Sequence, residues 1–281
     1  MAVPYSDIGK SASDLLSKDF PIGSAKLEIS SLASNGAKFT VLGSKDNKTN
    51  AIAGEFKSKY TVKPQGLTLT EAWTTGNVLS VDVESADFFA KGLKLNLATA
   101  VLPASGQRNA KFNAEYRQSH FYSRTFCDLT RPTITEDVVV AHDGILAGGE
   151  FSYDIAGRKI SRYNAALGYI GPDYAVSLHA SNAFGSFTAA YFHKVRSDLE
   201  VGAKATWNRG TDSTVAIEAG SKWVLDRESF IKAKVDSTGR LGLGYSQLLR
   251  PGVKLGLGAS FDTAGVKADA HKMGVSLTFD F

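Results

Sequence analysis

Apolar and polar residues alternate one for one through much of the chain after residue 24. The pattern is clearest in two stretches near the C-terminus, whose apolar faces are Val253, Leu255, Leu257, Ala259 and Phe261 in the first and Met273, Val275, Leu277, Phe279 and Phe281 in the second. A period of two residues is that of a β-strand whose two faces meet different surroundings. The pattern therefore predicts strands, although some segments, such as 121–129, alternate poorly.

Turn-forming residues divide this region into segments of roughly 9 to 11 residues, the length of a membrane-spanning strand. Such breaks lie at residues 34–36, 75–77, 171–173 and 250–252. All 7 prolines lie at breaks or in the N-terminal region, as expected because proline cannot donate to a strand ladder. The segments number about nineteen.

Two architectures explain the alternation. In a soluble sandwich the apolar faces form a shared interior, whereas in a membrane barrel they face lipid and the polar faces line water. So many consecutive strands with hairpin-length connections favour a wide closed barrel, because closure leaves no sheet edge. No window approaches the roughly 18 uninterrupted apolar residues of a membrane helix. We therefore expect an all-β fold, a transmembrane β-barrel of about 19 strands.

The start of the chain differs from the rest because it carries a helical period. In residues 5–20 the apolar side chains of Ile8, Ala12, Leu15 and Leu16 fall on one helical face. A solitary amphipathic helix needs an apolar surface, and the inner wall of a barrel offers one; the membrane interface outside the barrel is the alternative. We expect an N-terminal helix and linker at 1–24, with the helix inside the lumen, and a transmembrane barrel at 25–281.

The polar faces of the predicted strands carry many charged residues. The basic ones are Lys26, Lys38, Lys57, Lys59, Lys94, Lys111, Arg117, Lys204, Lys222, Lys232, Lys234, Lys254 and Lys272. Acids such as Glu55, Glu84, Glu115, Glu150, Glu200 and Glu218 lie among them. Mixed charges with a modest basic excess predict a water-filled lumen with a weak preference for anions. The alternative is the solvated face of a soluble sheet.

On the predicted helix, Lys10, Asp14 and Lys18 follow a spacing of four residues and so form a charged stripe. With the helix in the lumen, this stripe would narrow the aqueous path. Movement of the helix or of the wall charges in an electric field gives a route to voltage gating, because one charge crossing 100 mV gains about 2.3 kcal/mol. Voltage gating is therefore a hypothesis from the sequence.

Glu71 breaks the alternation. It shares the predicted apolar face with Leu67, Leu69 and Trp73, so the pattern places a carboxylate toward lipid. Such a placement costs up to a few kcal/mol near the bilayer midplane. A β-bulge that turns Glu71 inward is the alternative.

The sequence offers no chemistry for catalysis. The 5 histidines lack metal-ligand spacing, and neither a phosphate loop nor a nucleophile elbow is present, so we expect neither an enzyme nor a cofactor. Cys127 is the single cysteine, which precludes an internal disulfide. The net charge of +4 is distributed without a basic run, so no nucleic-acid partner is expected, and the N-terminus shows no secretory signal. The pairs Gly242/Gly244 and Gly256/Gly258 lie on the lumenal parity, where we interpret them as easing strand bending.

Several stretches together resemble the mitochondrial porins, the voltage-dependent anion channels, and are most similar to the fungal branch. They are Pro4 to Ile8, Asp14 to Phe20, Gly66 to Trp73, Lys91 to Leu95, Asn109 to Lys111 and Gln247 to Gly252. Nineteen strands is the number known for this family, so the strand count above is not independent of the resemblance.

The resemblance implies a voltage-gated channel of the mitochondrial outer membrane that passes ATP, ADP and small anions. By this resemblance Gly92, Leu93 and Lys94 take part in nucleotide interaction, and Lys10 and Lys18 face the permeating anions. Glu71 corresponds to a lipid-facing glutamate of some members.

The resemblance also implies how the chain reaches its membrane. Lys272, Gly274, Leu277 and Phe279 resemble the signal read by the mitochondrial outer-membrane assembly machinery. Homo-oligomerisation is left open. Compared with animal members, the linker has fewer glycines, with Pro21 and Gly23, and Ser13 replaces a basic residue.

Two other functions compete with the channel. A protein-import pore of the same architecture would need acidic interior tracts and long terminal extensions, and the chain shows neither. A soluble β-sheet binding module would share the alternation but would stay monomeric in water without detergent.

Overall fold

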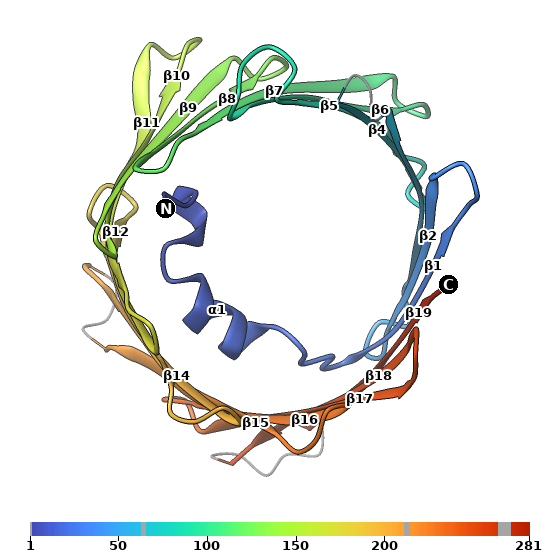
Figure 1. Ribbon diagram of the computed structural model, residues 1–281, viewed down its shortest axis with the longest axis vertical. Coiled ribbons are helices and arrows are strands. Elements are labelled where there is room, and N and C mark those ends of the chain that lie inside the picture. The colour runs from blue at the N-terminus through green and yellow to red at the C-terminus, as the bar shows by residue number, and fades with distance from the viewer. Residues whose placement is uncertain (1, 63–65, 211–213, 264–270) are drawn as a thin grey trace.

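The computed structural model describes residues 2–62, 66–210, 214–263 and 271–281. Across these residues the chain forms 19 strands that close into one barrel, with the N-terminal segment inside (Figure 1). The strands are β1 (Ser24–Leu32), β2 (Lys38–Asp46), β3 (Ile52–Val62), β4 (Leu67–Thr74), β5 (Leu79–Ala86), β6 (Leu93–Leu102), β7 (Gln107–Arg117), β8 (Phe121–Asp128), β9 (Thr133–His142), β10 (Ile145–Asp154), β11 (Lys159–Ile170), β12 (Tyr174–Ser181), β13 (Ser186–Lys194), β14 (Leu199–Asn208), β15 (Ala216–Val224), β16 (Ser229–Asp236), β17 (Arg240–Arg250), β18 (Val253–Asp262) and β19 (Lys272–Asp280). The expected barrel is confirmed.

Each strand pairs antiparallel with the next, and the barrel closes through a parallel pair, β1 with β19. In that pair Ala25 lies opposite Val275, and Leu27 lies opposite Leu277. An odd number of strands forces one parallel pair, because consecutive strands run in alternating directions. Closure gives the first and the last strand a partner each, so neither presents an open edge.

The inner face is identified by the N-terminal segment that lies against it. The ammonium groups of Lys232 and Lys234 on β16 bond to carbonyl oxygens of that segment, so these side chains point inward. Residues of opposite parity point outward, and among them Trp73 and Trp223 are 58% and 56% exposed. The predicted polarity is thereby confirmed: charged side chains surround the lumen and large apolar ones cover the outside.

The N-terminal segment is a broken helix, which corrects the expectation of one continuous helix over 5–20. A 3-10 turn, η1 (Tyr5–Asp7), precedes an α-helix, α1 (Lys10–Ser17), and the two are separated at Gly9. Gly9 has φ +76°, and a Cβ there would collide with the hydroxyl of Ser177 on β12. Only glycine meets both demands without strain. Among the described residues, no helix is long and apolar enough to cross a membrane.

The apolar core lies between this segment and one side of the wall. Tyr5 and Ile8 are buried with Tyr122, Val139 and Leu146 from β8, β9 and β10. The helix α1 then contacts β13, β14 and β15, and its buried side chains are those of Ala12, Leu15 and Leu16. In Figure 1 the helix lies on the side of the lumen formed by β14 and β15. Burial of each such large side chain contributes about 1.5–3 kcal/mol, so the apolar face predicted from the sequence holds the segment to the wall.

Candidate functional site in the lumen

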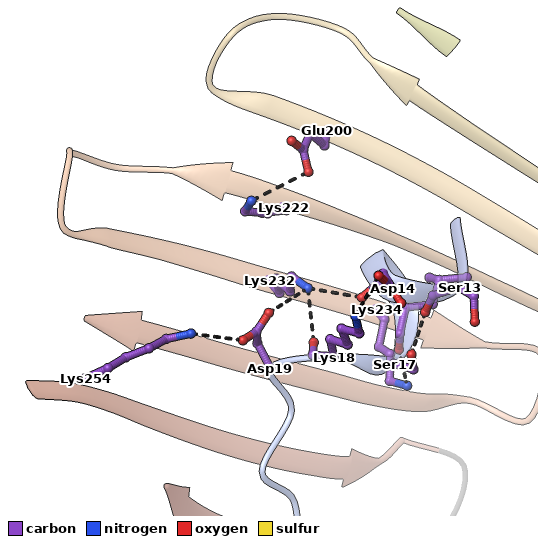
Figure 2. Close-up of polar contacts among 11 residues, drawn as sticks. Ser13, Asp14, Ser17, Lys18, Asp19, Glu200, Lys222, Lys232, Lys234 and Lys254 are labelled. Carbon is purple, nitrogen blue, oxygen red and sulfur yellow. Dashed lines mark hydrogen bonds and ion pairs between the residues drawn. The ribbon is translucent and has the colours of Figure 1, made fainter. Parts of the chain in front are cut away.

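Two lysines of β16 bind the C-terminal end of α1 (Figure 2). Nζ of Lys232 donates to the carbonyl oxygens of Asp14 and Lys18, at 3.3 and 3.1 Å. Nζ of Lys234 donates to the carbonyl oxygen of Leu16 at 2.7 Å. The last carbonyls of a helix lack partners within it and carry partial negative charge, so cations there satisfy and stabilise them.

Asp19, directly after the helix, joins the same contacts. Its carboxylate lies 3.1 Å from Nζ of Lys232 and 3.3 Å from Nζ of Lys254 on β18. Burial opposes ionisation of this carboxyl, but the hydrogen bonds and charges of the two lysines outweigh it and lower the pKa of Asp19. We call Asp19, Lys232, Lys234 and Lys254 the latch, because they tie the end of the helix to the wall.

The sequence marked these lysines only as lumenal. Nothing in a one-dimensional pattern shows which of the many lumenal lysines meets the helix, since that depends on where the helix lies. The position of Asp19 after the predicted helix was the one available signal.

The charged stripe of the helix faces the open lumen and is internally paired. Nζ of Lys10 lies 2.9 Å from Asp7, and Nζ of Lys18 lies 2.7 Å from Asp14. The hydrogen bond to Asp7 raises the pKa of Lys10. Because each lysine has an acid beside it, the stripe carries little net charge.

Glycines line the inner wall where the N-terminal segment lies against it. A Cβ on Gly202 or Gly220 would lie 2.8 Å from Leu15 or Leu16, respectively. A Cβ on Gly258 would lie 2.9 Å from backbone atoms of Pro21. These glycines let the segment approach the strands closely, which is a role that the interpretation as bending aids did not foresee.

The first residues are held on the opposite side of the Gly9 break. The amide of Ala2 donates to the carbonyl oxygen of Ser119 at 2.9 Å, and Nε2 of His179 donates to the carbonyl oxygen of Ile8 at 3.0 Å. Burial, followed by the charges of Glu150 and Asp137, raises the pKa of Tyr5 to about 12. Tyr5 is therefore a neutral apolar anchor at physiological pH.

An open passage remains beside the latch. A cavity of about 890 Å³ separates the linker from the wall formed by β1, β2 and β3. The charged residues that line it are Lys18, Asp19, Lys26, Glu28, Glu55 and Lys254. Three bases and three acids leave the passage only weakly charged.

The other predicted nucleotide-interacting residues lie elsewhere. Lys94 is on β6, and Lys111 and Arg117 are on β7, across the lumen from α1 (Figure 1). Lys94 pairs with Glu84 at 3.0 Å, and Gly92 lies in the turn before β6 with φ +84°. The structure therefore does not bring this group together with Lys10, Asp14 and Lys18.

Glu71 lies on β4 among outward-facing residues. It is opposite Ser58 on β3 and Val81 on β5, and neither pairing contains a register shift that would turn it inward. The outward placement favoured from the sequence thus agrees with the backbone.

On β19, Lys272 and Gly274 face the lumen, whereas Leu277 and Phe279 face outward. Gly274 lies directly under the carbonyl of Pro21. Their predicted role in assembly stays a prediction. Within the described parts of the chain, no group of three or more His, Cys, Asp or Glu could hold a metal ion.

Comparisons with known proteins agree over the whole length. The sequence pattern of the eukaryotic porin family matches residues 2–274. The mitochondrial outer membrane protein porin of Neurospora crassa is 44% identical over 283 residues, 100% of each chain. The non-selective voltage-gated ion channel 1 of Saccharomyces cerevisiae is 38% identical over 280 residues, 98% of each chain. A mutant of the Rh. blastica porin shares the fold alone, with a TM-score of 0.55 and 11% identity over 86% of this chain and 100% of that one. This chain belongs to the eukaryotic porin family.

Proposed function

We propose that the protein is a voltage-gated, weakly anion-selective channel of the mitochondrial outer membrane that passes ATP, ADP and other small metabolites and ions. The observation that carries the proposal is a closed barrel, apolar outside and charged inside, with its N-terminal segment tied into the lumen by the latch. The names of its relatives, an outer-membrane porin and a voltage-gated ion channel, support the same function. Neither name supports protein import, the competing function.

Selectivity follows from the charges of the passage. Most lumenal lysines have an acid nearby, as in the pairs Lys94–Glu84 and Lys222–Glu200 at 3.0 and 3.7 Å. Paired charges of opposite sign cancel at a distance, so the basic excess attracts phosphate and carboxylate without holding them. Weak preference and fast passage are therefore two results of one arrangement.

Gating follows from the position of the segment. The latch, the lumenal glycines and the apolar face hold the segment against the side of the wall that runs from β8 to β19 in the open state. An electric field that drives charges of the segment or of the wall releases this contact, and the freed segment obstructs the lumen. Voltage works against the docking energy at about 2.3 kcal/mol per charge per 100 mV.

Reconstitution in a planar bilayer tests the function. We expect a conducting state at zero voltage, closure as voltage rises, and a reversal potential in a salt gradient that shows weak anion preference. Channels that are closed at zero voltage, or an open state that prefers cations, would contradict the proposal.

A matched pair of charge reversals tests the passage. Lys26→Glu changes a cavity residue, whereas Lys48→Glu changes an exposed residue of the β2–β3 turn. We expect the first to shift the reversal potential toward cations and the second to shift it much less, because exposed charges are screened within about 10 Å. Equal shifts would place the selectivity outside the lumen.

Further roles rest on the resemblance and are proposed with it. Lys94, Lys111 and Arg117 interact with nucleotides that pass along the far wall, and Gly92 and Leu93 shape the turn that presents Lys94. The C-terminal strand is the signal read by the outer-membrane assembly machinery. Nucleotide-dependent current block in Lys94→Gln, and membrane insertion of Phe279→Ala, test these two roles separately.

A further inference from the structure

The outer surface carries a second carboxylate besides Glu71, and it is built into hydrogen bonds. Glu136 lies on β9 between Thr135 and Asp137, and its register partners are Thr125 on β8 and Phe151 on β10. Val139, three positions along the same strand, is fully buried with Tyr5 and Ile8 in the lumen. Because faces alternate along a strand, Glu136 points outward.

Two hydroxyl groups of β8 hold this carboxylate. Oγ of Ser123 donates to Oε1 at 2.8 Å, and Oγ1 of Thr125 donates to Oε2. Each carboxylate oxygen thus has one donor, and a carboxylate offers about four acceptor positions. Two positions stay open toward the membrane. In contrast, Glu71 has no side-chain hydrogen bond to any residue that the structure describes.

The location suits a ligand that lies at the membrane interface. Glu136 is three residues from the end of β9 that carries the β8–β9 turn. Three residues span about 10 Å along a strand, or about 7 Å along the membrane normal for a strand tilted by about 45°. A headgroup at the interface can reach this depth while its alkyl chain enters the hydrocarbon.

The chemistry of the site selects the headgroup. A carboxylate on the lipid-facing surface is unfavourable without a partner, and the partner that offsets its charge is a cation. The exposed ring of Phe151, 48% accessible, lies beside Glu136 and offers a second contact for a cation. Phosphate-bearing headgroups place negative charge against the carboxylate and are disfavoured.

We propose that Ser123, Thr125 and Glu136 form an outward-facing binding site for a primary amine amphiphile, a single alkyl chain with a protonated amino group. The ammonium donates to the two open acceptor positions of Glu136, its remaining N–H faces the interface, and its chain lies along the apolar wall of β8–β10. The site is on the outside of the barrel and is independent of the lumenal passage.

Photolabelling tests the site on the full-length protein in phosphatidylcholine vesicles. The probe is a hexadecylamine with a diazirine near the amino group, and labelled peptides are identified by mass spectrometry. We expect labelling of β8–β10, and a loss of about tenfold or more in Glu136→Gln, since a charge-assisted hydrogen bond is replaced by a neutral one. Glu71→Gln is the matched control and should leave this labelling unchanged.

Two further arms separate the hydrogen bonds from simple charge attraction. The trimethylammonium analogue of the probe keeps the charge but lacks N–H donors, so it should label the site several-fold less. Ser123→Ala removes one donor to the carboxylate and should reduce labelling while the barrel stays folded. Equal labelling of wild type and Glu136→Gln, equal labelling by both probes, or a cross-link between two protein copies through this patch would each overturn the proposal.

Discussion

Replacement of Lys232 by methionine should weaken the docking of the N-terminal segment on the lumenal wall. The effect should exceed that of neutralising any other charged residue of the wall. Methionine keeps an unbranched chain of similar volume but loses the ammonium group. The wild-type side chain is only 5% exposed, and its ammonium bonds to two helix carbonyls and to Asp19. The change therefore removes several contacts at one point.

The magnitude follows from those contacts. A hydrogen bond that involves a charged group contributes about 1.5–3 kcal/mol, and the carbonyls released here regain water from the lumen, so the total loss is about 3 kcal/mol. This raises the undocked population about 10²-fold. If about three charges move on gating, as in voltage sensors, the voltage of half-closure falls by about 40 mV.

The assay is the conductance–voltage curve in a planar bilayer, with Lys222→Met as the matched control. Lys222 is the register partner of Lys232, faces the same lumen, and pairs with Glu200 rather than with the segment. Both variants remove one positive charge, so they should change ion selectivity alike, but only Lys232→Met should ease closure. Equal curves for the two variants would refute the latch as a determinant of gating, and Lys232→Arg should restore most of the wild-type curve.

Three other changes test the same contact from different sides. Gly258→Ala should release the linker and so increase protease access to the N-terminal segment, because the new Cβ would lie 2.9 Å from backbone atoms of Pro21. Gly242→Ala is the control: its Cβ meets only a flexible lysine side chain, so protease access should change little. Leu16→Ala should cost about 2–5 kcal/mol of docking, seen as faster amide exchange in α1, because the side chain is 1% exposed. The pKa of Asp19 is lowered, so its contribution to the docking of the segment is fully present above the ordinary carboxyl range and is lost as pH falls through the lowered pKa. The voltage dependence of gating should therefore stay constant from neutral pH down to about pH 4 and change below it.

The alternation of the sequence was sufficient to predict the strands and their polarity. It succeeds where the two sides of the wall differ most, as in β18, where Leu255 and Leu257 face out and Lys254 faces in. Closure and the parallel β1–β19 pair then follow from geometry and from an odd number of strands. The apolar stripe of Ile8 to Leu16 likewise predicted which face of the N-terminal segment is buried.

The segment that alternated poorly did so for reasons that only the structure shows. On β8, Tyr122 faces the lumen yet is buried, because the N-terminal segment covers it. On the same strand, Ser123 and Thr125 face outward yet are polar, because they hold Glu136. Each face of β8 is thus mixed in polarity, because charged Arg124 shares the lumenal face with Tyr122 and apolar Phe121 shares the outer face with Ser123. A sequence pattern cannot distinguish this mixture from a lack of order.

The break at Gly9 was missed because the helical period continues across it. Ile8 and Ala12 are spaced as in one helix, yet the collision of any Cβ with Ser177 and the positive φ are tertiary facts. A glycine in a short amphipathic helix was the available signal, but alone it lowers helix stability by only about 1 kcal/mol relative to alanine.

The positions of the lumen-facing glycines indicate where the N-terminal segment docks, which the interpretation of glycines as aids to strand bending left out. Within the described strands, the lumen-facing glycines lie on β10–β19, and they are Gly148, Gly168, Gly202, Gly220, Gly242, Gly244, Gly256, Gly258 and Gly274. All of these except Gly242 would place a Cβ within 4 Å of the N-terminal segment. A barrel wide enough to conduct has no packing reason to leave side chains off its inner wall, since water fills the lumen. Lumenal glycines concentrated on one side therefore indicate a second backbone lying against that side, and they identify the wall where the helix docks before any coordinates are known.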